Sequence, residues 1–81
     1  MVHKLKTLPK FFQQQKIGIK TFEYRKNDKD FRINDFLLLQ EWDNGYTGDE
    51  IIVKVTNILH DWEFKDLKNG YCILSTKLIK S

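Results

Sequence analysis

The sequence predicts a small, mostly β domain of the α+β class, with about five strands and one main helix over residues 9–17. Three observations predict this class. Apolar residues repeat with a period of two in several segments, as they do in strands with two different faces. Glycines and Asn–Asp pairs separate these segments. At 81 residues the chain has room for one domain, residues 1–81, whose strands we expect to close into a small antiparallel barrel.

The first two elements are a strand and the helix. Residues 3–8 alternate and predict a short strand. Leu8, Phe11 and Phe12 are spaced to share one face of the helix that follows. Gly18 is predicted to end the helix in the left-handed conformation that other residues resist.

The rest of the chain predicts four more strands. Residues 36–42 form an apolar run that we expect to be buried on both faces, and Ile51, Val53 and Val55 are expected to share one side of their strand. Cys72 is expected to be a small buried residue. The four strands cover residues 21–26, 36–42, 50–59 and 71–78.

Composition excludes several classes of protein. The longest apolar runs are far shorter than the ~20 residues that span a bilayer, and the first residues lack the apolar stretch of a signal peptide. A single cysteine excludes an internal disulfide. His3 and His60 lack the spacing of metal ligands. We therefore expect a cytoplasmic protein without membrane contact, metal or cofactor.

Charge is distributed unevenly along the chain. Residues 1–34 contain nine Lys or Arg and three acidic residues, whereas residues 35–81 contain five and eight. This asymmetry favours an anionic partner that contacts the first half. A solvated lysine-rich face is the alternative interpretation.

The densest group of charged side chains follows the helix, in the pattern Gly18-x-Lys20-x-x-Glu23-x-Arg25. Strand alternation places Glu23 and Arg25 on one face and assigns Tyr24, on the other face, to packing. Lys20 and Arg25 could bind a phosphate or a polarised carbonyl, and Glu23 could accept from a base edge or orient Arg25. The alternative is an exposed strand with ordinary ion pairs.

This pattern resembles the signature of the ASCH (activating signal cointegrator homology) domain, a family of PUA-like fold. Similar residues recur over nearly the whole chain, and they match a small branch found in bacteria and phages. The resemblance implies a compact, mostly antiparallel β-barrel with a helix across one end and a cleft beside the motif. It also implies RNA binding. The further matching segments are 5–12, 20–28, 31–35, 41–42, 46–48 and 70–75.

Some members of this family are amidohydrolases that use a lysine, a threonine and a distant glutamate on acylated cytidine-type amines. Lys20 matches that lysine, but Glu23 stands in the place of the threonine. A carboxylate cannot replace a hydroxyl nucleophile without a change of chemistry. Thr21 could supply a hydroxyl one position earlier on the Glu23 face, although strand propensity also explains a threonine there.

Other residues extend the candidate binding surface. Trp42 and Tyr46 flank a glycine turn and could stack on bases, with a place in the core as the alternative for Trp42. Lys26 continues the basic segment, together with Lys29 and Arg32, and could follow a nucleic-acid backbone.

We therefore expect a module that binds RNA or a nucleotide-like ligand through Lys20, Glu23, Arg25, Lys26, Trp42 and Tyr46. A nucleoside-processing amidohydrolase is the alternative, with Lys20, Glu23 and Thr21 as its candidate catalytic residues. A protein-interaction domain without a small ligand is a third interpretation.

Overall fold

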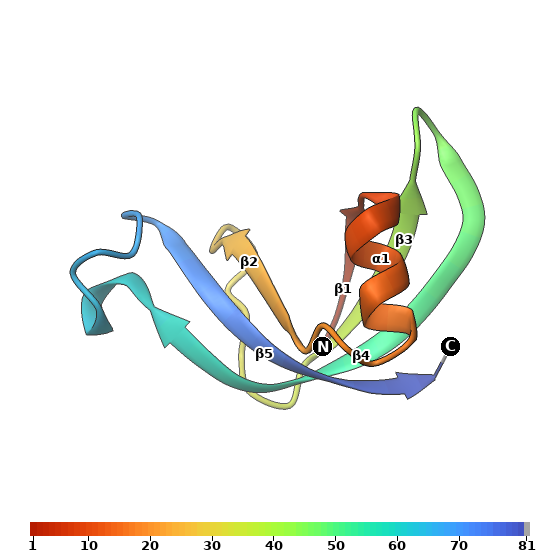
Figure 1. The fold of residues 1–81 in the computed structure, drawn as a ribbon. Helices are drawn as coiled ribbons and strands as arrows, with labels where there is room; N and C mark the ends of the chain where they lie inside the picture. The colour runs from red at the N-terminus through yellow and green to blue at the C-terminus, as the bar shows by residue number, and fades with distance from the viewer. Residues whose placement is uncertain (81) are drawn as a thin grey trace.

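The computed structural model, which describes residues 1–80, contains a single five-stranded sheet with one short helix beside it (Figure 1). The five predicted strands and the predicted helix are all confirmed. The elements are β1 (Val2–Thr7), α1 (Pro9–Lys16), β2 (Phe22–Lys26), β3 (Phe36–Trp42), β4 (Tyr46–His60), a 3-10 turn (Asp61–Glu63) and β5 (Tyr71–Lys80).

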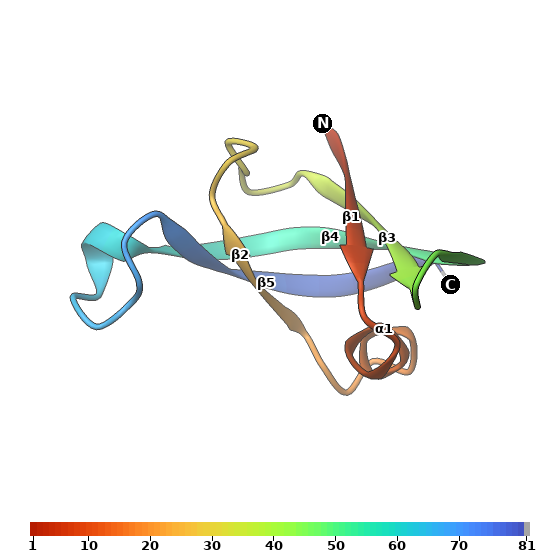
Figure 2. The ribbon, with the colours of Figure 1, turned by 90° about the horizontal axis from the view of Figure 1, so that it is seen from above.

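The sheet is mixed and strongly curled, with the strand order β1-β3-β4-β5-β2. Strands β1 and β3 are parallel, and the other three neighbouring pairs are antiparallel. The long strands β4 and β5 bend, so that the sheet forms a half-barrel with β1 and β2 at its two edges (Figures 1 and 2). The mostly β fold with one helix is confirmed, and its sheet stays open between β1 and β2. Among residues 1–80, no helix has the length and apolar character needed to cross a membrane.

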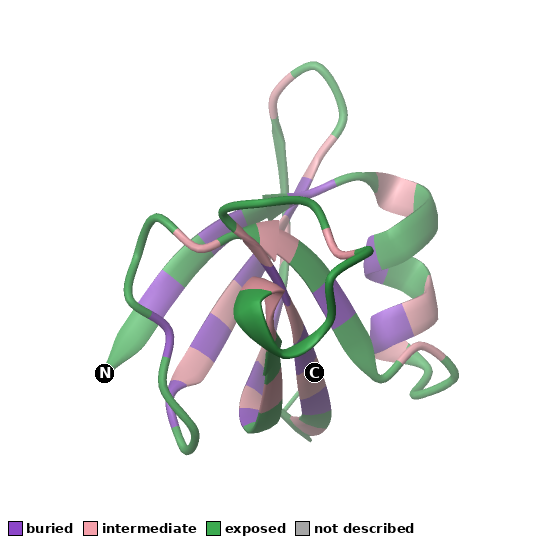
Figure 3. Ribbon diagram, turned by 90° about the vertical axis from the view of Figure 1, so that its left-hand side faces the viewer, coloured by how far each residue is buried: buried purple, intermediate pink, exposed green. Residues whose placement is uncertain are grey.

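The core lies on the concave face of the curled sheet. Buried residues alternate with exposed or half-buried ones along the strands, as Figure 3 shows. The predicted inward side of β4 is confirmed, and Phe12 from α1 is completely buried against the sheet residues. The buried apolar residues are Leu5, Phe12, Phe31, Leu37, Leu39, Ile51, Val53, Val55, Cys72 and Leu74.

The expectation that β3 is buried on both faces is wrong. One face of the strand is buried. The residues of the other face are only half-buried, because no element covers the outside of the sheet; they are Phe36, Leu38, Gln40 and Trp42.

Leu8, which immediately precedes the helix, and Phe11 do not join Phe12 in the core and are 57% and 42% exposed. An eight-residue helix contacts the sheet along one narrow stripe, here Phe12 and Gln15, which are three positions apart.

Gln15 is a buried polar residue that attaches α1 to two strands. Its side-chain amide donates to the carbonyl oxygen of Phe22 at 2.9 Å, and the Thr76 hydroxyl donates to its Oε1 at 3.1 Å. These bonds join the helix to the start of β2 and to β5. They position the corner between helix and strand where the charged motif lies.

A second buried polar group fixes the loop before β3. Asp35 accepts from the Arg32 backbone N–H at 3.0 Å and pairs with His3 Nε2 at 2.8 Å and with the terminal ammonium group at 3.2 Å. Burial opposes ionisation of Asp35, but these partners outweigh it and lower the pKa of the carboxyl. The ionised carboxylate therefore links β1 to this loop.

Candidate functional site

The turn after α1 brings the charged motif together. Gly18 has a φ of +83°, as predicted, and the backbone N–H groups of Ile19 and Lys20 both donate to the carbonyl of Gln14 at 3.1 Å. This turn reverses the chain tightly at the end of the helix. Lys20 therefore lies at the corner from which β2 begins.

The side chains of Lys20 and Arg25 both approach one carboxylate oxygen of Glu23, and we call these three residues the triad. Lys20 Nζ donates to Glu23 Oε2 at 3.3 Å, and Arg25 Nε lies 3.7 Å from the same oxygen. The Lys20 and Glu23 side chains are 11% and 6% exposed, and that of Arg25 is 26% exposed. Shielding from water strengthens such contacts, so this triad differs from an exposed ion-pair ladder.

The second oxygen of Glu23 is buried and unpaired. No donor among the described residues bonds to Oε1, whereas Lys20 Nζ also donates to the Phe22 carbonyl at 2.5 Å. A buried carboxylate oxygen without a donor is costly, because its hydration is lost and nothing replaces it. Glu23 Oε1 therefore lacks a donor among the described residues, while Glu23 itself lines the pocket described next.

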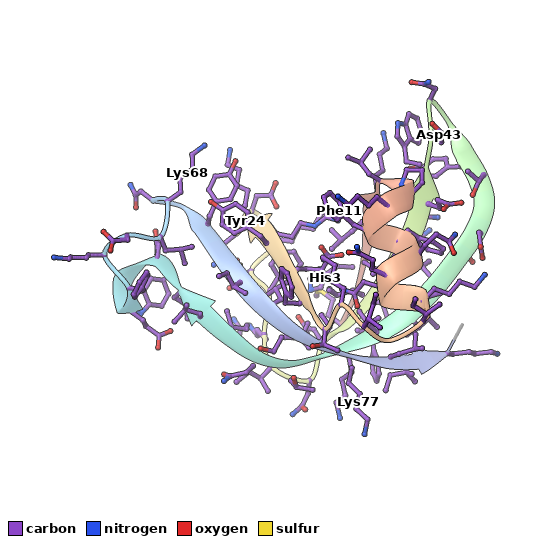
Figure 4. All side chains as sticks on the ribbon, viewed as in Figure 1. His3, Phe11, Tyr24, Asp43, Lys68 and Lys77 are labelled. Carbon is purple, nitrogen blue, oxygen red and sulfur yellow. The ribbon has the colours of Figure 1, made fainter. Side chains whose placement is uncertain are left out.

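Glu23 forms part of the wall of a pocket between α1 and β2. The cavity has a volume of about 450 Å³, within the range of small-molecule sites. Figure 4 labels Phe11 on α1 and Tyr24 on β2, at the two sides of this space. The pocket is lined by Phe11, Gln14, Ile19, Lys20, Phe22, Glu23 and Tyr24.

Aromatic rings form much of this wall. Phe22 and Tyr24 are 49% and 46% exposed, and Lys20 Nζ lies 4.6 Å from the centre of the Phe22 ring and 5.7 Å from that of Phe11. The assignment of Tyr24 to packing holds in part. Its ring stacks on Tyr71 at 5.1 Å, but the residue is 46% exposed and also lines the pocket.

Arg25 has a second set of contacts across the opening of the half-barrel. Its Nη2 donates to the carbonyl oxygen of Lys6 at 2.9 Å and to the hydroxyl of Thr7 at 3.3 Å. Both acceptors belong to β1, at the opposite edge of the sheet. Arg25 therefore joins β2 to β1 where no ladder of backbone hydrogen bonds does so.

The other predicted site residues lie outside this pocket. Trp42 and Tyr46 contact each other at the β3–β4 hairpin, with ring centroids 4.8 Å apart, and the Lys6 ammonium lies 4.0 Å above the Trp42 ring. Trp42 is half-buried and Tyr46 is 57% exposed. Figure 4 labels Asp43 at the tip of this hairpin, away from Tyr24.

Thr21 and Lys26 flank the triad along the chain. Thr21 precedes β2, and its exposed side chain is not among those that line the pocket. Lys26 ends β2 and is exposed. The structure thus brings Lys20, Glu23 and Arg25 together and leaves Thr21, Trp42 and Tyr46 apart from them.

The sequence did not reveal the apolar wall of the site. Phe11 and Phe22 follow ordinary helix and strand patterns, and no signal in the sequence marks them as exposed. Among residues 1–80, no three His, Cys, Asp or Glu side chains are grouped to hold a metal ion. Cys72 is fully buried, and burial, followed by the charges of Asp61 and Asp28, raises the pKa of its thiol.

The fold and site together define a small β half-barrel domain with a ligand-sized pocket at its open edge. The chain belongs to the family described as "Domain of unknown function (DUF3850)", whose model matches residues 2–76. It is 34% identical over 64 residues to an uncharacterised 12.9 kDa protein from the GpA 3′ region of Escherichia phage P2. That similarity covers 75% of this chain and 59% of the phage protein, so the chain spans less than two thirds of its relative's length.

Proposed function

We propose that the pocket between α1 and β2 binds the base of a nucleotide or of single-stranded RNA. The observation that carries the proposal is an aromatic-walled cavity whose lining includes Glu23, a carboxylate with one buried oxygen that has no donor among the described residues. A carboxylate oxygen accepts well from the exocyclic amine of a base, and aromatic rings stack on base faces. The resemblance to the ASCH domain, drawn from the Gly18-to-Arg25 motif, supports the same proposal.

Each side chain of the triad has a part in this binding. Glu23 accepts from an amine of the base, and Lys20 donates to a neighbouring ring nitrogen or carbonyl oxygen. Arg25, bonded to β1 and close to Glu23, limits the movement of the carboxylate. Phe22 and Phe11 supply apolar surface for the base. Bases that carry an exocyclic amine should therefore bind more tightly than uracil.

Titration calorimetry with cytidine 5′-monophosphate and uridine 5′-monophosphate tests the proposal. Glu23→Gln keeps the size of the side chain and removes the charge, and it should weaken cytidine monophosphate binding about tenfold or more, the effect of one charge-assisted hydrogen bond. Phe22→Ala should weaken binding of both nucleotides by about fivefold or more, because stacking is lost from either base.

Glu50→Gln is the matched control, because Glu50 is exposed on β4 outside this pocket. Circular dichroism and urea unfolding show whether each variant is folded. A folded Glu23→Gln protein that binds both nucleotides as tightly as the parent would remove the basis for this site. So would the absence of any nucleotide binding by the parent protein.

A second candidate function is hydrolysis of an acylated cytidine-like amine. The contact of 3.3 Å between Lys20 Nζ and Glu23 Oε2 favours it, because Lys20 would polarise the acyl carbonyl while the free oxygen of Glu23 accepts a proton from water. Incubation with a panel of acylated cytidines, followed by chromatography, tests this activity. A lack of product at high protein concentration would contradict this second function.

A further inference from the structure

A second hollow lies on the other side of Arg25, near the end of β2. Its volume is about 150 Å³, and it lies between β1, the end of β2 and the loop that follows. Arg25 lines this hollow and contacts Glu23, which lines the first pocket, so the two spaces adjoin through this pair of side chains. The residues of this basic hollow are Leu5, Arg25, Lys26, Asp28, Lys29 and Phe31.

Charge distinguishes the basic hollow from the aromatic pocket. Three cationic side chains line it against one carboxylate, that of Asp28. The side-chain ammonium groups of Lys26 and Lys29 form no hydrogen bond or ion pair with any of residues 1–80, and both residues are exposed. Their charges are therefore not neutralised by the protein, which favours an anion here.

Arg25 is already oriented for such an anion. Its Nη2 bonds to Lys6 and Thr7 of β1, and its Nε faces Glu23. The guanidinium has five N–H groups, so donors on Nη1 remain for a ligand. A fixed guanidinium loses little conformational entropy on binding, and its Nη1 can donate a charge-assisted hydrogen bond to a phosphate oxygen.

The two spaces are separated by a distance that one ligand can bridge. Arg25 follows Glu23 by two residues on the same face of β2, and a strand advances about 3.3 Å per residue, which separates their Cα atoms by about 7 Å. This separation is comparable to the reach from the edge of a base to a phosphate on the same nucleotide. A base in the aromatic pocket would thus bring its phosphate toward Arg25, Lys26 and Lys29.

We propose that the basic hollow is a phosphate subsite, so that the ligand is a nucleotide or RNA strand and not a free nucleoside. This inference rests on the proposed function, because it takes the base in the aromatic pocket as the other end of the ligand. Lys26 and Lys29 attract the phosphate, and Arg25 bonds to it. The phosphate contributes affinity that depends on salt.

Binding of cytidine, cytidine 5′-monophosphate and cytidine 3′-monophosphate to the parent protein tests the subsite. The monophosphate that reaches the hollow should bind about tenfold more tightly than cytidine at low salt, as expected for charge-assisted contacts. The double variant Lys26→Ala/Lys29→Ala should lose most of this gain and bind cytidine unchanged. Lys65→Ala/Lys77→Ala removes the same charge from exposed positions outside the hollow and should keep the gain.

The outcomes separate the two proposals. If cytidine binds but neither phosphate adds affinity, or if the Lys26/Lys29 variant keeps the full gain, the phosphate subsite is wrong and the base pocket stands. If none of the three ligands binds the folded parent protein, the proposal of a base pocket is wrong, and the proposal of a phosphate subsite is then wrong as well.

Discussion

Arg25→Ala should destabilise the domain, because this side chain joins the two edges of the half-barrel. The substitution removes bonds of 2.9 Å and 3.3 Å to Lys6 and Thr7 of β1 and takes one of two cations from the buried Glu23. A hydrogen bond from a charged donor contributes about 1.5–3 kcal/mol, and partial exposure of Arg25 places the expected loss near the lower end, at about 2 kcal/mol.

This loss is large for a domain of this size. Stabilities of about 0.05–0.15 kcal/mol per residue give roughly 4–12 kcal/mol for the whole chain. A loss of about 2 kcal/mol should lower the melting temperature by roughly 8–16 °C. Urea unfolding followed by circular dichroism measures the change, provided that the m-value stays the same.

Two further variants separate the hydrogen bonds of Arg25 from its charge. Arg25→Lys keeps a cation near Glu23 but loses the planar fork, so it should recover only part of the lost stability. Arg32→Ala is the control, because the Arg32–Asp30 pair is exposed on both sides, and its unfolding midpoint should not change. If Arg25→Ala unfolds at the same urea concentration as the parent, the edges of the sheet do not depend on this bridge.

Three other predictions concern the core and the buried ionisable groups. Phe12→Ala should cost about 3–5 kcal/mol in urea unfolding, because it empties the contact between helix and sheet; a loss below about 1 kcal/mol would contradict that packing. The Asp35 carboxyl has a lowered pKa when folded, so it stabilises the fold above its unfolded pKa of about 4, and this contribution disappears as the pH falls through the lower folded value. Asp35→Asn should therefore flatten the fall of stability between pH 6 and pH 3, and an unchanged slope would refute this role. Cys72 is buried and its pKa is raised, so a thiol reagent should label it slowly in the native protein and rapidly in urea; equal rates would show that the strand opens readily.

The strands and the helix could be predicted from the sequence because their signals are local. Alternation of apolar residues in β4 identified the inward side, and Gly18 identified the end of the helix. The parallel pairing of β1 with β3 could not be predicted in this way, because it depends on where α1 and β2 carry the chain. The open edge between β1 and β2 is likewise a property of the whole sheet.

The charged residues of the candidate site could be predicted from the sequence, but its apolar lining could not. Glu23 and Arg25 follow Lys20 by three and five residues, and this spacing indicated that the three side chains can meet at the start of the strand. Phe11, Phe22 and Tyr24 have patterns that normally predict burial. They line a pocket because β2 is an edge strand and α1 contacts the sheet along one stripe only. Exposure of this kind is decided by tertiary structure.

The open edge also explains why the link between β1 and β2 and the proposed binding site meet at Arg25 and Glu23. In a closed barrel, the backbone of β2 would pair with β1, whereas here Arg25 makes the link and approaches Glu23 Oε2 on its way across. That approach, together with the bond from Lys20, occupies one carboxylate oxygen and leaves Oε1 without a donor among the described residues. A ligand that bonds to Oε1 would supply the missing donor and stabilise the folded state by mass action. The melting temperature of the parent protein should therefore rise with nucleotide concentration, and that of the Glu23→Gln variant should rise less at the same concentrations.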